Sequence, residues 1–223
     1  MSFSFDARFQ PTSLDFAEVL RQLEFILPAS GIDYDGEIAR LHSRSGVPTV
    51  TSLQSESVPT LADIATYASS WWGVGLYCIS RPLAEALGRT DSMEVYINIF
   101  KARGGGLMVE YNENSGAFRA RRDSTALSAN LIAFLTRTAS ALEVDRVIYS
   151  EEVEHAAPPE LSVLIALLEQ QAQSDRALET LAIVSKNVMS LEKAQQLAGA
   201  WAPSLRLTID GFVVAPFLGG ERP

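Results

Sequence analysis

Residues 71–80 read WWGVGLYCIS, and residues 93–122 read MEVYINIFKARGGGLMVEYNENSGAFRARR. Strand-forming residues dominate both runs, and turns rich in glycine or asparagine interrupt the second one. The pattern predicts strands at about 72–79, 94–103, 107–112 and 117–121, of which the last three form an antiparallel meander. Apolar residues occupy both faces of the first strand, which predicts that both of its faces are covered.

Segments with helical or strand periodicity lie on either side of this stretch. Residues 2–9 alternate apolar and polar side chains, which is typical of a half-buried strand. Helices are predicted at residues 14–27, 60–70 and 124–142, each after a capping Thr or Ser (Thr12, Thr60 and Ser124). Short strands are predicted at 37–42, 47–53 and 144–149, and a helical turn at 81–87.

The acidic residues 151–159 form the predicted boundary, because charge and two prolines replace the hydrophobic pattern there. Beyond it, helices are predicted at 159–173 and 190–201. Residues 176–186 suit a helix or a buried strand, and we favour the helix. Asp210-Gly211 lies between apolar alternations and predicts a terminal β-hairpin.

These elements predict an α+β fold with a mostly antiparallel central sheet packed by helices, a helical C-terminal segment and a terminal β-hairpin. The predicted division is an α+β sheet domain at residues 1–150, followed by the helical segment and hairpin at residues 151–223. A hairpin that rejoins the central sheet would instead make the chain a single domain.

Composition places the chain among ordinary globular proteins, since 47% of its 223 residues are hydrophobic and 20% are charged. The best apolar run, residues 161–168, is far shorter than the roughly 18 residues of a membrane span. Asp6 and Arg8 interrupt the N-terminus before a signal core can form. Cys78 is the only cysteine and excludes an internal disulfide. We therefore expect a cytoplasmic protein that does not enter a membrane.

The net charge of −9 is concentrated in one segment. Residues 143–160 hold a net charge of −5, because six acidic residues oppose Arg146 alone. Phosphate groups are bound mainly by Lys and Arg, so this balance argues against direct nucleic-acid binding. The segment is the predicted site for a basic protein partner, and its acidic residues are Glu143, Asp145, Glu151, Glu152, Glu154 and Glu160.

Two short motifs resemble ligand loops. Gly104-Gly105-Gly106 precedes a predicted strand and lacks the Lys-Ser/Thr pair of a phosphate-binding loop, so a hairpin connection is favoured. Asp33, Asp35 and Glu37 surround Gly36, but no further carboxylates follow to complete a calcium loop. A solvated turn before a strand is therefore favoured there.

Catalytic residues are not identifiable from the sequence. His42 and His155 lie in no recognisable catalytic or metal-binding spacing, and Cys78 lies in an apolar strand as expected of a buried, unreactive thiol. We predict no catalytic residue, no bound metal and no cofactor. The alternative is an enzyme or small-ligand protein whose site is assembled from scattered residues near Trp71 and Trp72.

Basic side chains gather on the predicted meander at Lys101, Arg103, Arg119, Arg121 and Arg122. They suit an acidic partner or a nucleic acid, but we favour a protective role, since charged residues on edge strands prevent edge-to-edge aggregation.

The chain resembles bacterial immunity proteins in its size and in lacking catalytic motifs, disulfides and an export signal. Such proteins bind and neutralise a cognate toxin, often a nuclease, inside the producing cell. The resemblance implies that the acidic segment 143–160 covers a basic toxin site in place of a nucleic-acid backbone. The function expected from the sequence is therefore non-enzymatic binding of a protein partner.

Overall fold

The computed structural model describes residues 4–44, 47–50, 56–68, 70–88, 93–151, 160–173 and 180–215. One antiparallel sheet takes up every strand in these ranges, in the order β10-β11-β9-β8-β1-β7-β6-β5-β2-β3, with β4 also paired to β2. The strands are β1 (Ser4–Phe9), β2 (Ile32–Arg44), β3 (Val47–Val50), β4 (Glu56–Ser57), β5 (Gly73–Ser80), β6 (Glu94–Lys101), β7 (Leu107–Asn114), β8 (Arg146–Glu151), β9 (Leu181–Ser185), β10 (Arg206–Leu207) and β11 (Phe212–Ala215).

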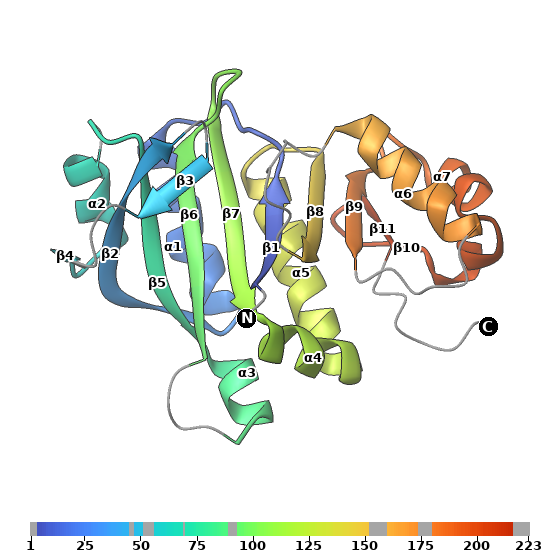
Figure 1. The fold of residues 1–223 in the computed structure, drawn as a ribbon, viewed down its shortest axis with the longest axis horizontal. Coiled ribbons are helices and arrows are strands. Elements are labelled where there is room, and N and C mark those ends of the chain that lie inside the picture. The colour runs from blue at the N-terminus through green and yellow to red at the C-terminus, as the bar shows by residue number, and fades with distance from the viewer. Residues whose placement is uncertain are drawn as a thin grey trace.

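Helices pack on both sides of this sheet, but on different parts of it. The helices are α1 (Phe16–Ala29), α2 (Leu61–Ala68), α3 (Arg81–Ala86), α4 (Ser115–Asp123), α5 (Thr125–Ala141), α6 (Leu161–Gln173), α7 (Leu191–Ala198) and the 3₁₀ turn η1 (Gly199–Ser204). Figure 1 shows α1 and α5 behind the central strands, while α6 and α7 lie beside β9–β11 at the other end of the sheet.

The main hydrophobic core lies between one face of the sheet and the helices α1, α2, α4 and α5. We call this face of the sheet the covered face. Alternate residues of the central strands point into it, as Val95, Ile97 and Ile99 of β6 do. Leu76 of β5 lies directly opposite Ile97, and both are buried. A second core fills the space between β9, β11, α6 and α7 on the opposite face.

The predicted α+β class with a central antiparallel sheet is confirmed. Ser124 caps α5 as expected, because its hydroxyl accepts a hydrogen bond from the Leu127 N–H. Thr60 likewise accepts from the Asp63 N–H before α2. The cap of α1 is Asp15 and not Thr12, whose hydroxyl instead donates to the Leu142 carbonyl at 2.6 Å.

The predicted strand at 117–121 is wrong, because these residues belong to helix α4. Asn114 caps this helix by accepting from the Ala117 N–H at 3.0 Å. Ala117, Phe118 and Arg121 are buried at helical spacing, so the predicted meander lacks its strand at 117–121. The basic residues expected on neighbouring strands are consequently divided between the β6–β7 hairpin and α4.

The helix favoured for residues 176–186 is also wrong where the structure describes it, since residues 181–185 form strand β9. All five residues are buried, and the two cores lie on its two faces. A strand covered on both sides has no alternation for a sequence pattern to reveal. The β-branched residues Ile183 and Val184 favour the extended form that the structure shows.

The C-terminal hairpin continues the sheet of the first part of the chain. β11 pairs with β9, and β9 pairs with β8, so hydrogen bonding runs without a break from β10 to β3. Gly211 takes a positive φ of 82° in the connecting turn, a conformation that favours glycine. The division of the chain into 1–150 and 151–223 stays a prediction. In the ranges described above, no helix is both long enough and apolar enough to cross a membrane.

Candidate functional site

The sheet has a second face across β1, β7, β6 and β5, opposite the main core, which we call the open face. None of the described helices packs against it, and it points toward the viewer in Figure 1. Because side chains alternate along each strand, the register aligns those of this face in two cross-strand rows. One row contains Tyr77, Tyr96, Asn112 and Asp6, and the other contains Gly75, Asn98, Glu110 and Arg8.

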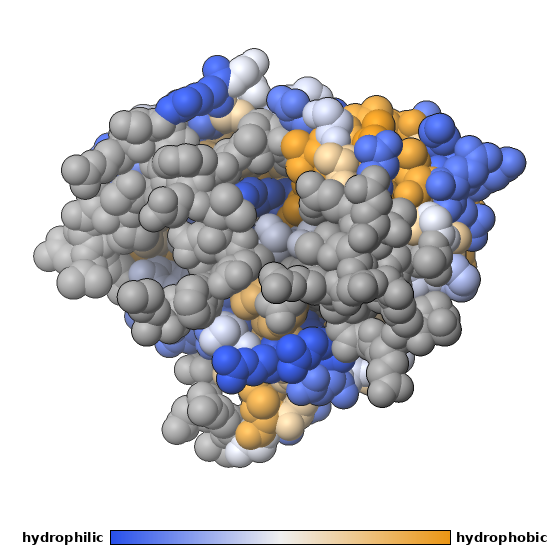
Figure 2. Space-filling view, turned by 45° about the vertical axis from the view of Figure 1, so that its right-hand side comes forward, coloured by the Kyte–Doolittle hydropathy of each residue, from blue (hydrophilic) through white to orange (hydrophobic). Residues whose placement is uncertain are grey.

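The middle of the open face is polar and nearly enclosed. The Arg8 guanidinium lies 3.4 Å from an Asp6 carboxylate oxygen and 3.7 Å from one of Glu110. Asn98 donates its side-chain N–H to the Asn112 side-chain oxygen at 3.1 Å. The side chains of Asp6, Arg8 and Glu110 are about a tenth exposed or less. Figure 2 shows hydrophilic residues within a hollow on this side of the molecule.

The end of the open face nearest α3 is more accessible. Here Tyr96 donates its hydroxyl to a Glu94 carboxylate oxygen at 2.7 Å, and its ring meets Tyr77 edge-on with centroids 5.1 Å apart. Both tyrosines are partly exposed, while Glu94 and Asp35 are exposed. We call Asp33, Asp35, Tyr77, Glu94 and Tyr96 the tyrosine–carboxylate patch.

A bulge in β2 brings Asp35 into this patch. The register of β2 against β5 shifts between Tyr34 and Ile38, and Gly36 has a positive φ of 91°. The Asp35 carboxylate accepts a hydrogen bond from the Glu37 N–H at 2.9 Å. The expected solvated turn before a strand is therefore a bulge within a longer strand.

Negative charge accumulates in the patch. Partial burial raises the pKa of Asp35, and the carboxylates of Glu37 and Glu94 raise it further against the lowering effect of the Glu37 N–H. Burial and the bond to Glu94 likewise raise the pKa of Tyr96, so its phenol remains a donor at neutral pH. Asp33 forms an ion pair with Arg81 at 2.8 Å.

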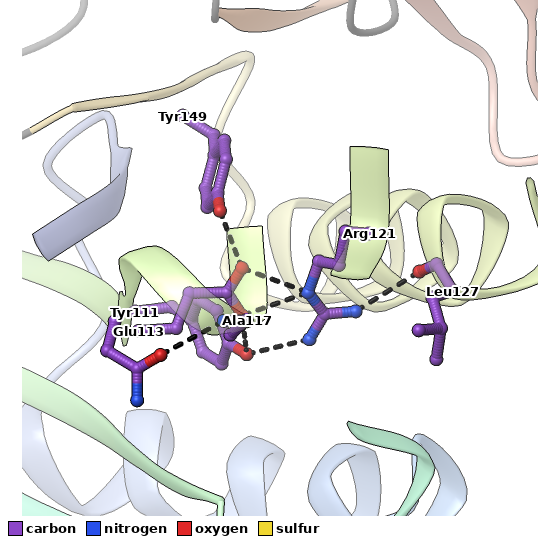
Figure 3. Close-up of polar contacts among 7 residues, drawn as sticks. Tyr111, Glu113, Ala117, Arg121, Leu127 and Tyr149 are labelled. Atoms are coloured by element: carbon purple, nitrogen blue, oxygen red, sulfur yellow. Dashed lines mark hydrogen bonds and ion pairs between the residues drawn. The ribbon is translucent and has the colours of Figure 1, made fainter. Parts of the chain in front are cut away.

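A second polar cluster lies on the covered face and is sealed from solvent (Figure 3). Glu113 accepts from Arg121 Nε at 2.9 and 3.0 Å and from the hydroxyls of Tyr111 and Tyr149 at 2.6 and 2.5 Å. Arg121 also donates to the Leu127 carbonyl and to the Tyr111 hydroxyl.

The four residues of this cluster, Tyr111, Glu113, Arg121 and Tyr149, are each at most 2% exposed. Burial is the main reason why the pKa of both tyrosines is raised. The cluster joins β7, β8, α4 and the start of α5, so its role is to hold α4 and α5 on the sheet. It is a structural network without access for a substrate.

The described acidic residues predicted to bind a partner lie before β8, at its last residue and before α6. Glu143 is exposed in a turn with a positive φ of 56°, and Asp145 precedes the strand. Glu151 ends the strand, and the exposed Glu160 precedes α6. Glu152 and Glu154 lie outside the described residues. A strand of this length spans about 20 Å, so Glu143 and Glu151 lie too far apart to belong to one compact cluster.

The residues considered for chemistry are placed apart from one another. Cys78 is buried on β5, and burial, with Asp35 and Asp33, raises the pKa of its thiol, which disfavours the reactive thiolate. His42 is partly buried on β2, and His155 lies outside the described residues. Within the described ranges, no three His, Cys, Asp or Glu side chains are grouped to hold a metal ion.

The two adjacent tryptophans lie on opposite faces of the sheet. Trp71 belongs to the main core, where its ring meets Tyr67 and the Arg40 guanidinium. Trp72 stacks on Phe100 on the open face, beside Leu41 and Met108. The structure therefore does not bring the two indoles together around one pocket. Gly104–Gly106 form the β6–β7 hairpin connection, as expected.

Sequence reasoning did not find the tyrosine–carboxylate patch. The spacing of Glu94 and Tyr96 in a strand would have placed both on one face, and the pairing of Tyr96 with Tyr77 requires the β5–β6 register. The bulge that adds Asp35 has no signal except the glycine at position 36. The patch is thus a product of tertiary structure.

No protein-family model matches the chain, and no curated protein matches it. Among solved structures, the chain is similar to a bacterial protein described as "Pseudomonas aeruginosa T6SS protein PA0821". The TM-score is 0.45 and the sequence identity 10%, and the match covers 99% of this chain and 67% of that one. A similarity at this level carries no argument about function.

Proposed function

We propose that this chain is a non-enzymatic binding protein that neutralises a basic, nuclease-like toxin, in the manner of an immunity protein. The observation that carries the proposal is the net charge of −5 on segment 143–160. Glu143 and Glu160 are exposed, and among the described residues neither they nor Asp145 forms an ion pair.

Charge of this kind acts over distance. A cluster of one sign raises the association rate with an oppositely charged protein by about 10- to 1000-fold, and added salt removes most of the gain. An acidic surface that covers a basic site competes directly with the nucleic acid that site would bind.

The placement of the carboxylates favours a partner of domain size. Glu143 lies just before β8 and Glu151 is its last residue, and a strand of that length spans about 20 Å. A small ligand cannot contact both ends, whereas a standard protein interface of about 800 Å² per partner does. We therefore expect a folded, basic protein.

The test is the association rate with the product of the neighbouring gene, prepared as an inactive variant and measured at low and high salt. Replacing Glu151, Glu152 and Glu154 by Gln should leave the melting temperature nearly unchanged and slow association by about tenfold at low salt. The difference between variant and wild type should vanish at high salt.

A matched control carries the same change in net charge elsewhere, at Glu24, Glu85 and Glu192, all of which are exposed. This triple Gln variant should associate at close to the wild-type rate. If both variants slow association equally, the association rate depends on net charge alone and not on the position of segment 143–160. Absence of any complex with a basic neighbouring gene product would overturn the proposed function.

A further inference from the structure

We infer that the tyrosine–carboxylate patch on the open face is the docking surface for an arginine-bearing segment of the basic partner. The inference rests on the proposed function and deepens it, because it names a second contact surface, separate from segment 143–160, and the side chain that this surface receives. Three properties of the patch support the inference: two partly exposed aromatic rings, two carboxylates that form no ion pair with described residues, and a rigid support.

The two rings are suited to a guanidinium group. Tyr77 and Tyr96 meet edge-on at an interplanar angle of 75°, so their two ring planes are not parallel. A guanidinium is attracted to the face of such a ring by the cation–π interaction. Tyrosines with one apolar side and one polar end are also enriched in protein interfaces.

The carboxylates add charge complementarity. Among the described residues, Asp35 and Glu94 form no ion pair, and the partner of Asp33 is Arg81. Both members of that pair are about half exposed, at 46% and 57% of their side chains. Such a pair contributes little to stability, so its carboxylate remains available to an incoming cation.

The patch is held in place before any partner arrives. Tyr77 and Tyr96 are directly opposed on the paired strands β5 and β6, and the Tyr96 hydroxyl is fixed by Glu94. Asp35 is fixed by the Glu37 N–H within the bulge. Preorganised groups lose little conformational entropy when they bind, which raises affinity.

Like charges crowd the patch in the unbound protein. The raised pKa of Asp35 reports the cost of its burial and of its proximity to Glu37 and Glu94. A bound guanidinium removes the repulsive part of this cost. Arginine fits better than lysine, because its planar group both stacks on tyrosine and donates two parallel hydrogen bonds to a carboxylate.

The probe is a peptide, acetyl-Gly-Arg-Gly-Arg-Gly-amide, titrated into the full chain with isotope-labelled tyrosine rings. The Tyr77 and Tyr96 ring resonances should shift and saturate with this peptide, shift less with the lysine version, and stay unchanged with the uncharged citrulline version. Absence of a saturable shift at these two rings, or an equal shift with citrulline, would overturn the inference.

A double variant, Asp35→Asn with Glu94→Gln, removes two charges and keeps the shapes of both side chains. It should bind the arginine peptide about five- to tenfold more weakly, whereas the control variant Glu24→Gln with Glu85→Gln should bind like the wild type. Equal affinity of the two variants would show that the patch is not the docking surface.

The same variants separate this inference from the proposed function. If the neighbouring gene product binds the wild type and the patch double variant with equal affinity, the patch inference fails and the function stands. If the arginine peptide binds at the patch but the gene product forms no complex, the function fails, and with it the assignment of the patch to that partner.

Discussion

Two neighbouring strands carry the same pair of residues in opposite surroundings. On β7, Tyr111 donates its hydroxyl to Glu113 at 2.6 Å, and on β6, Tyr96 donates to Glu94 at 2.7 Å. In both pairs the residues are two positions apart and therefore lie on one side of their strand. The β7 pair lies on the covered face, and the β6 pair lies on the open face.

The surroundings give the two pairs different roles. Glu113 is sealed from solvent, and Arg121 and Tyr149 provide it with a counter-charge and a further donor. Glu94 is exposed, and its charged neighbour is Asp35, which carries the same sign. A buried carboxylate must be paired, whereas an exposed one can keep its charge for a partner. Burial, and not the local motif, therefore decides whether such a pair is a structural contact or leaves its charge available to a partner.

The largest expected effect is on the buried pair. Replacing Arg121 by Met leaves the Glu113 carboxylate buried without its counter-charge, which should lower the free energy of unfolding by about 3–5 kcal/mol. Urea unfolding measures the change. Arg122→Met is the matched control, because Arg122 lies next to it on α4 and is exposed, and its effect should stay within about 0.5 kcal/mol. A similar small change for both variants would contradict the structural role of the cluster.

A smaller effect separates the two kinds of tyrosine. Tyr149→Phe removes a hydroxyl that donates to the buried Glu113 and should cost about 1–3 kcal/mol. Tyr96→Phe removes the equivalent bond at the partly exposed patch and should cost no more than about 0.5 kcal/mol, since water replaces the lost donor. If the two substitutions cost the same, burial is not what distinguishes the two pairs.

Elements with clear hydrophobic periodicity or a clear capping residue could be predicted from the sequence. Helix α5 begins after Ser124, and β1 alternates Phe5, Ala7 and Phe9 toward the core as expected. The sequence did not predict the correct element where tertiary packing overrides the local pattern. Strand β9 is covered on both faces and lacks alternation, and α4 follows an asparagine that serves both turns and helix caps.

The candidate site could be predicted only in part, for the same physical reason. The charge of segment 143–160 is a property of composition and is visible in the sequence. The patch depends on the pairing of Tyr77 with Tyr96 and on a bulge that moves Asp35, and both are long-range features. Arg121 was misplaced for a similar reason. It was expected on an exposed strand, but it lies in α4 and is the buried counter-ion of Glu113.

The smallest expected effect concerns the charge of the patch itself. The pKa of Asp35 is raised in the folded state, so the fold favours its protonated form. The contribution of Asp35 to the free energy of unfolding is therefore fully present below its pKa in the unfolded chain, about 3.9. This contribution is lost as the pH rises through the pKa of Asp35 in the folded protein. Asn at this position keeps an oxygen that accepts from the Glu37 N–H and does not titrate.

Asp35→Asn should therefore match the wild type in stability below about pH 4 and exceed it at pH 7. The gain at pH 7 should stay below about 0.5 kcal/mol, because solvent screens an exposed carboxylate. Thermal unfolding of both proteins between pH 3 and 7 measures the difference, with the exposed Glu85→Gln as a control. A variant that is less stable than the wild type at pH 7 would show that Asp35 is not repelled by Glu37 and Glu94. The patch would then lack the repulsion between carboxylates that a cationic partner is proposed to relieve.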